Sequence, residues 1–209
     1  MARRYVRAFG LHNFAVLAAR TLKAKLDDRF GTGAGSLRRV ARRFGVRCVQ
    51  AEDVNDPGFL SHLRELGTDL IVSVSCPQIF RRPLIDLPPR GCLNMHGALL
   101  PKYRGIAPSF WMMANGEREA GVTLFFVNEN IDAGEVVAVE RFSIEPTETL
   151  EAFILRSKGI ACELLLRTLD RIERGTVETS PLDTKNGSYF GFPTRDDYRR
   201  FRAHGRKLW

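Results

Sequence analysis

Two short apolar runs constrain the fold of this chain more than any other feature of its sequence. The first, residues 69–75 (DLIVSVS), is nearly continuous in apolar residues and has the length of one strand. Such a run is typical of a strand that is buried on both faces within a parallel sheet. The second run, residues 91–96 (GCLNMH), predicts the next strand. Strands of this kind must be covered on both sides, so the pair predicts an α/β protein.

The rest of the sequence supplies elements that can surround these strands. Apolar residues recur at helical spacing, which predicts helices over residues 11–26, 37–44, 57–66, 108–115 and 149–173. Further apolar runs predict strands over residues 46–50, 121–128 and 135–144. We therefore expect a Rossmann-like open, mostly parallel sheet with helices on both faces.

Length and composition indicate one core. With 209 residues and 44% apolar content, the chain can bury one substantial core but hardly two. We expect a single domain over residues 1–175. Residues 176–209 carry few core signals, and we expect them to form an extension that packs on the domain through aromatic residues.

Several classes of protein are disfavoured by composition. No apolar run approaches the ~18 residues that a membrane span needs, and the N-terminal residues lack the apolar core of a secretory signal. A cytoplasmic protein is therefore expected. The four cysteines form no Cys-x-x-Cys pair, so neither a metal site nor a disulfide framework is predicted.

The net charge of +8 is concentrated near the ends of the sequence. Residues 1–47 hold twelve Lys or Arg against two Asp, and residues 195–209 hold six basic and two acidic residues. Basic ends could steer an anionic substrate such as a nucleotide-linked sugar or tRNA. They could equally be the solvated faces of ordinary helices.

Three polar residues form the candidate catalytic group. Asn94 and His96, two positions apart, project from the same face of the strand that ends at residue 96. Asp132 lies in a turn-rich link between two later strands, which brings it back towards His96. An amide, an imidazole and a carboxylate can stabilise a negative oxygen and move a proton, but none is a strong nucleophile. The group therefore suggests transfer through a tetrahedral intermediate, with the attacking group supplied by the substrate.

The segment NMHGALLPKYRG (residues 94–105), followed by GVT (121–123) and NIDAG (130–134), resembles the folate-dependent formyltransferase family. This family includes methionyl-tRNA, glycinamide ribonucleotide and sugar N-formyltransferases. The resemblance runs from about residue 36 to about residue 174. Ala98 is a departure, because many members carry Ser there; it affects none of the proposed catalytic roles.

The resemblance implies 10-formyltetrahydrofolate as formyl donor and a primary amine as acceptor, with Asn94, His96 and Asp132 as catalytic residues. It also places two groups of residues around the folate: Gln78, Ile79, Phe80 and Ile85 in one segment, and Val127, Asn128, Asn130 and Ile131 in the other. The first group could instead be an ordinary hydrophobic loop. Lys102 and Arg104 are candidates for binding the substrate, or could face only water.

The N-terminal sequence departs from the family pattern. Members normally begin with a strand, a glycine-containing loop, a helix and a second strand, and nothing before Leu11 supplies these elements. Either the sequence begins inside the domain or the first ~50 residues have been replaced, an estimate from the usual size of a βαβ unit. In both cases the expected domain is N-terminally shortened, which would favour a homodimer or reduced activity. The glycine-rich residues 31–36 lack the preceding strand that a phosphate-binding loop requires.

These features favour N-formyl transfer to a small amine, in particular a nucleotide-linked amino sugar. The small β-barrel domain that follows the catalytic domain of methionyl-tRNA formyltransferases has no counterpart in residues 176–209, so tRNA is the less favoured acceptor. The sequence is also compatible with hydrolysis of formyl-folate, and with a folate-binding module that has weak or no catalytic activity.

Overall fold

The computed structural model of the chain describes residues 2–30 and 37–209, so the glycine-rich residues 31–36 lie outside the described part. The chain divides into two compact units. One, the helical unit, comprises Met1–Glu52 with Thr194–Tyr198. The other, the sheet unit, comprises Asp53–Pro193 with Arg199–Trp209. Each unit is described by itself.

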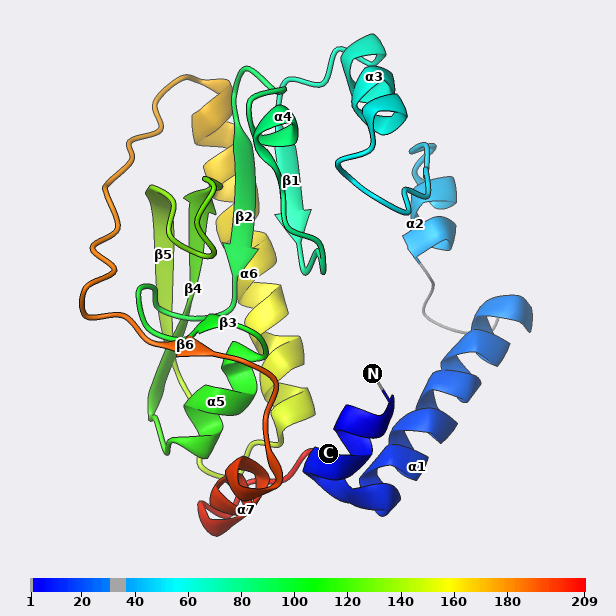
Figure 1. Cartoon of the computed structure of the whole chain (residues 1–209), viewed down its shortest axis with the longest axis vertical. Coiled ribbons are helices and arrows are strands. Elements are labelled where there is room, and N and C mark those ends of the chain that lie inside the picture. The colour runs from blue at the N-terminus through cyan, green and yellow to red at the C-terminus, as the bar shows by residue number, and fades with distance from the viewer. Residues whose placement is uncertain (1, 31–36) are drawn as a thin grey trace. The chain divides into compact units, whose positions relative to one another are not determined.

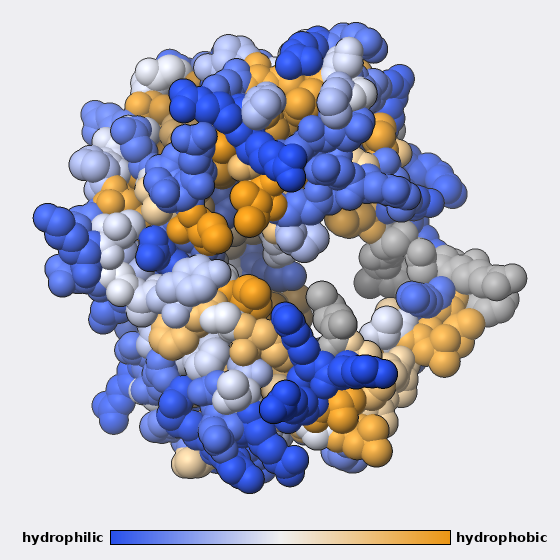
Figure 2. Space-filling model, viewed as in Figure 1, coloured by the Kyte–Doolittle hydropathy of each residue, from blue (hydrophilic) through white to orange (hydrophobic). Residues whose placement is uncertain are grey.

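The helical unit contains α1 (Ala2–Phe30) and α2 (Leu37–Arg43). Both expected helices are confirmed, although α1 starts earlier than expected and is interrupted at Gly10, where φ is 86°. The Asn13 side chain spans this break by donating to the Phe9 carbonyl at 2.7 Å. Hydrophobic residues lie on the surface of α1 (Figure 2), among them Leu11 and Leu22, which are 70% and 59% exposed.

The strand expected over residues 46–50 does not form. The Val46 amide bonds to the Ala41 carbonyl at the end of α2, and residues 46–50 pair with no strand in the described chain. A β-branched run is stabilised as a strand only when a neighbour accepts its backbone hydrogen bonds, and the described residues provide no such neighbour. Among the same residues, no helix combines the length and apolar content that crossing a membrane would require.

Four strands form the central sheet of the sheet unit (Figure 1) in the order β1 (Ile71–Val74), β2 (Cys92–His96), β4 (Glu119–Phe126) and β5 (Val136–Ser143). β1 and β2 are parallel, whereas β4 runs antiparallel to both β2 and β5. The α/β class is confirmed, but the expectation of a mostly parallel sheet is wrong. The link between β4 and β5 is too short for a crossover, so it can only join antiparallel neighbours.

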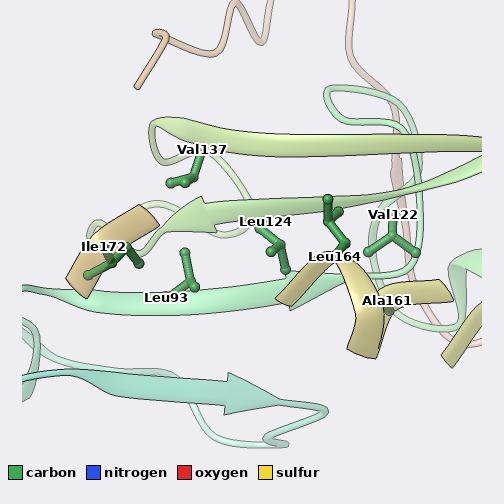
Figure 3. Packing of buried hydrophobic residues seen from close by; sticks show 7 residues of the cluster. All are labelled: Leu93, Val122, Leu124, Val137, Ala161, Leu164 and Ile172. Carbon is green, nitrogen blue, oxygen red and sulfur yellow. The ribbon is translucent and has the colours of Figure 1, made fainter. Parts of the chain in front are cut away.

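The main core lies between this sheet and α6 (Leu150–Glu173). Thr149 caps the helix by accepting a hydrogen bond from the Ala152 amide at 3.2 Å. Residues on one side of α6, Ala161, Leu164 and Ile172, pack against Leu93 and other inward-facing strand residues (Figure 3). Phe153 near the start of α6 is fully buried.

A short helix covers the opposite face of the sheet. Cys92 and Leu93 are consecutive in β2 and therefore point to opposite faces. Leu93 packs on α6, whereas the Cys92 thiol lies 3.6 Å from the Leu84 carbonyl in α4 (Arg82–Ile85). Helices thus lie on both faces, as expected. Burial raises the pKa of the Cys92 thiol to about 11, so it stays protonated and fills space.

Two further helices and a small second sheet complete the unit. α3 (Pro57–Glu65) starts at Asp56, whose carboxylate accepts from the Phe59 amide, and α5 (Pro108–Ala114) is almost entirely buried. β3 (Arg104–Gly105) pairs in parallel with β6 (Tyr189–Phe190).

The last residues return to the core. α7 (Arg195–Ala203) is hydrophilic on its visible surface (Figure 2), but Phe201 is fully buried and stacks on Phe110 at 5.1 Å. The Arg206 guanidinium is also buried, and its Nη1 donates to the carbonyls of Glu145 and Pro146.

Candidate functional site

The candidate site lies at the carboxyl end of β2. His96 is the last residue of the strand and is only 7% exposed, while Asn94 is partly buried two positions before it. Both side chains leave the strand on the side away from α6, because Leu93 and Met95, which alternate with them, contact the α6 core. Within the described chain, the Asn94 side chain has no hydrogen-bond partner, so its amide is available to a ligand.

The His96 ring is held by a backbone carbonyl. Its Nε2 lies 2.8 Å from the carbonyl oxygen of Tyr103. A carbonyl only accepts hydrogen bonds, so Nε2 carries a hydrogen and Nδ1 is the nitrogen that can exchange a proton. Tyr103 has a φ of 59°, a conformation that costs energy for a non-glycine residue and that is fixed by its surroundings.

Asp132 approaches the free nitrogen of that ring. One of its carboxylate oxygens, Oδ1, lies 3.7 Å from His96 Nδ1, and the side chain is only 14% exposed. The other, Oδ2, accepts a hydrogen bond from the Gly105 amide at 2.7 Å. The carboxylate is thus anchored by the backbone and acts on the imidazole by charge, across a gap longer than a direct hydrogen bond.

The loop that carries Asp132 is fixed by close packing. Asp132 itself has a φ of 48°. Two residues later, Gly134 is buried with its Cα so close to the Phe126 carbonyl that a β-carbon would collide with it. Asn128 closes the loop by donating to the Ala133 carbonyl at 3.1 Å. The local backbone therefore leaves few alternative positions for the carboxylate.

Thr123 fixes the segment that follows His96. It lies opposite His96 in β4 and is fully buried. Its hydroxyl donates to the Ala98 carbonyl at 2.7 Å and accepts from the Leu100 amide at 3.2 Å. These bonds set the path of the chain from His96 to Tyr103, whose carbonyl then reaches back to the imidazole.

The two segments expected around the folate lie next to each other. Arg82, in α4, forms an ion pair with Glu129 at 3.5 Å, which joins the segment of residues 78–85 to the loop of residues 127–131. Ile79 and Ile131 are 66% and 46% exposed, whereas Phe80, Ile85 and Val127 are partly buried. The backbone amide of Asn130 is already used by the Asn128 side chain.

The side-chain oxygen of Gln78 is already used by a hydrogen bond within the protein. Its Oε1 accepts a hydrogen bond from the Val54 amide at 2.9 Å. Of the two candidates for substrate binding, Lys102 is exposed, whereas Arg104 is partly buried and its Nε has no partner in the described part of the chain. A ligand could thus reach Lys102 more easily than Arg104.

Two backbone groups that position the candidate catalytic side chains were not predicted from the sequence. They are the carbonyl of Tyr103, which contacts His96, and the amide of Gly105, which contacts Asp132. Both lie in the motif of residues 94–105, but they act through backbone atoms, for which residue type gives no signal. The Tyr103 side chain is buried and stacks on Phe190 at 5.3 Å. Its hydroxyl donates to Glu117 at 2.7 Å and accepts from Asn115 at 3.3 Å.

The buried phenol of Tyr103 predicts how the free energy of unfolding depends on pH. Burial raises the pKa of its phenol from 10.0 to about 12. The unfolded chain loses this proton first, so the free energy of unfolding should fall as pH rises from 10 through 12, by up to about 2.7 kcal/mol. Tyr103→Phe should cost about 1 kcal/mol at pH 8, because the hydrogen bond to Glu117 is lost. The difference from wild type should shrink above pH 10 and change sign at about pH 11.

Urea unfolding of both proteins between pH 8 and 12 measures this difference. Other groups that titrate in this range affect both proteins equally and cancel. A difference that stays constant with pH would show that the phenol ionises alike in the folded and unfolded chains.

Comparison with known proteins identifies the family of this chain. Residues 20–169 match the formyl transferase family. Methionyl-tRNA formyltransferase from Kosmotoga olearia is 32% identical over 161 residues, which are 77% of this chain and 52% of that protein. This chain spans about half the length of the curated relatives that it matches.

Solved structures agree on the fold. A sugar N-formyltransferase from Shewanella sp FDAARGOS_354 superposes with a TM-score of 0.61 at 25% identity, covering 73% of this chain and 58% of that one. The formyltransferase PseJ from Anoxybacillus kamchatkensis, in complex with UDP-4,6-dideoxy-4-formamido-L-AltNAc and tetrahydrofolate, superposes with a TM-score of 0.62 at 22% identity, covering 78% and 82%. With the sequence match extending over well more than half of its residues, this chain belongs to the formyl transferase family.

Proposed function

We propose that this protein transfers a formyl group from 10-formyltetrahydrofolate to the primary amine of a small substrate, a nucleotide-linked amino sugar. One observation carries the proposal. The Asp132 carboxylate lies 3.7 Å from Nδ1 of a buried imidazole, at the strand end where the Asn94 amide has no hydrogen-bond partner among the described residues. The similar PseJ structure, which holds a UDP-linked formamido sugar and tetrahydrofolate, supports both the donor and the acceptor class.

The arrangement assigns a task to each side chain. The amine of the acceptor attacks the formyl carbon, and negative charge develops on the formyl oxygen. The Asn94 amide donates a hydrogen bond to this oxygen, and a protonated His96 Nδ1 can add a second donor. The Asp132 carboxylate stabilises the imidazolium and accepts the proton that the amine loses. Collapse of the tetrahedral intermediate breaks the bond between the formyl carbon and N10 of the donor, and that nitrogen takes up a proton and leaves as tetrahydrofolate. The 3.7 Å gap between His96 and Asp132 is consistent with reacting groups that enter beside the pair.

The formyl donor fits the surface beside this group. A reduced pteridine is a flat ring system with a polar edge, and it needs apolar side chains together with backbone donors and acceptors. Ile79 and Ile131 expose apolar surface on the two segments that the Arg82–Glu129 ion pair joins. We therefore assign residues 78–85 and 127–131 to the donor.

Methionyl-tRNA is the second candidate acceptor. It is favoured by the sequence relatives, since methionyl-tRNA formyltransferases from Kosmotoga olearia and Geobacter metallireducens are 32% and 34% identical to this chain. The basic residues of the helical unit would suit a polyanionic acceptor.

The proposal is tested by incubating the protein with 10-formyltetrahydrofolate and one acceptor at a time. Release of tetrahydrofolate that depends on a nucleotide-linked amino sugar is the expected result. Release that depends on methionyl-tRNA would transfer the function to the second candidate. Equal release without any acceptor would identify a hydrolase, and folate binding without turnover would contradict both transferase assignments. His96→Ala provides the control for chemistry at this site.

A further inference from the structure

A cavity of about 210 Å³ lies behind the candidate site, between the ends of β1 and β2, the start of α5 and one side of α6. We call it the α5–α6 cavity. Its walls are largely apolar and include Met95, Val122 and Ile154. A drug-sized ligand needs more than roughly 300 Å³, whereas cavities of about 150 Å³ accept benzene. The cavity therefore has room for one compact group of a larger molecule.

An unpaired hydroxyl lines this cavity. Ser157 is 5% exposed, yet its side chain makes no hydrogen bond within the described chain. A serine or threonine inside a helix usually bonds back to the carbonyl four residues earlier, as Thr168 does to Leu164 at 2.8 Å in the same helix. The Ser157 oxygen is not among the fully enclosed unpaired atoms of the described chain, so water can reach it in the cavity, where it is available to a hydrogen-bonding group of a ligand.

One cationic residue is among those that line the cavity. Lys158 is exposed, lines the cavity and forms no ion pair with any described residue. Ser75 and Ser109 also line the cavity. An occupant that fits these groups combines an apolar body, a hydrogen-bonding group that reaches Ser157, and an anion at Lys158.

The cavity lies on the α6 face of the sheet, whereas the Asn94 and His96 side chains leave the opposite face, so the two places adjoin only at the end of β2. Gly97 follows His96 directly and lines the cavity with backbone alone. Four described residues other than glycine have a positive φ, and all belong to these two places. Tyr103 and Asp132 hold the imidazole, while Ser75 and Ala107 line the cavity. Conformations of this kind persist only where the surrounding structure fixes them, often at functional sites.

We propose that the α5–α6 cavity is the specificity pocket for the acceptor, and that it takes a compact apolar group of a molecule that also carries an anionic group. This inference rests on the proposed function, because it assigns the occupant as the acceptor amine. It adds that the protein selects a small apolar substituent, which the acceptor extends past the end of β2 while its amine stays at Asn94 and His96.

Binding of phenyl phosphate to the whole chain tests the pocket without donor or turnover. Calorimetry should show saturable binding of phenyl phosphate, and weaker binding of benzyl alcohol, which lacks the anion, and of inorganic phosphate, which lacks the ring. Lys158→Gln should weaken the binding of phenyl phosphate at least about threefold and leave the binding of benzyl alcohol unchanged. The effect is modest because the Lys158 side chain is exposed to solvent. Lys185→Gln, an exposed lysine outside the cavity, is the matched control and should change neither.

The second part of the binding experiment uses a variant that fills the cavity. Ser157→Leu should place apolar atoms in the space, raise the melting temperature and weaken phenyl phosphate at least about tenfold. Ser157→Ala keeps the space open and should retain binding of benzyl alcohol. It is the second variant in case Ser157→Leu folds poorly.

The outcomes separate this inference from the proposed function. Absence of saturable phenyl phosphate binding, or binding that both Ser157 variants leave unchanged, would overturn the pocket even if formyl transfer occurs. Binding that survives in His96→Ala, together with no turnover by the wild type on any amine, would retain a binding pocket and remove the proposed reaction.

Discussion

Replacing His96 with alanine is expected to lower formyl transfer by more than about a hundredfold, with little loss of folate binding. The imidazole is buried, held through Nε2 by the Tyr103 carbonyl and placed 3.7 Å from the Asp132 carboxylate. Loss of one positioned donor to a developing oxyanion typically costs about 3 kcal/mol of transition-state stabilisation. The two segments that we assign to the donor, residues 78–85 and 127–131, do not include His96. Single-turnover kinetics and folate titration measure the two quantities separately.

Asp132→Asn is the matched variant for this test. An asparagine can still accept the hydrogen bond from the Gly105 amide, so the loop should keep its position. The negative charge beside Nδ1 is lost, so turnover should fall while the melting temperature stays close to that of wild type. Near-normal turnover in His96→Ala would remove the imidazole from the reaction, and normal turnover in Asp132→Asn would show that its charge is dispensable.

The second large effect is expected for Gly134→Ala. A β-carbon at this position would collide with the carbonyl oxygen of Phe126, a backbone atom within β4 that cannot move aside cheaply. Relief requires either displacing the loop of residues 127–134 or bending the strand. We expect a loss of about 3 kcal/mol or more in the free energy of unfolding, and a drop in turnover because Asp132 lies two residues away.

Gly159→Ala is the control for this substitution. Gly159 lies in the middle of α6 and a β-carbon there would meet nothing within 4 Å. The same chemical change should therefore stabilise the protein by up to about 1 kcal/mol, through helix propensity alone. Chemical unfolding of the two variants gives the comparison. Equal stabilities for both would show that the contact at Gly134 relaxes without cost.

The sequence predicted the local elements of the sheet unit well. The runs at 69–75 and 91–96 became β1 and β2, and the apolar spacing over 149–173 became α6. These segments are long or strongly patterned, and their pattern matches the burial that they have in the fold. Residues 46–50 have the same local character as a strand but form none. A strand depends on partners that its own residues do not encode.

The direction of the strands is also not encoded by the local sequence pattern. Local pattern identifies β4 and β5 as strands, but it does not say whether a neighbour runs parallel or antiparallel. The expectation of a mostly parallel sheet was therefore wrong, and the order β1-β2-β4-β5 with one parallel pairing became clear only from the pairing itself.

By itself, the sequence determined the side chains to which we assign the chemistry, namely Asn94, His96 and Asp132, because residue type and spacing are local properties. Only the tertiary structure decided how they are held. The imidazole is oriented by the Tyr103 carbonyl and the carboxylate by the Gly105 amide, so both anchors are backbone atoms. Every residue carries these same backbone groups, and only folding selects which of them meets a side chain that lies far away along the chain.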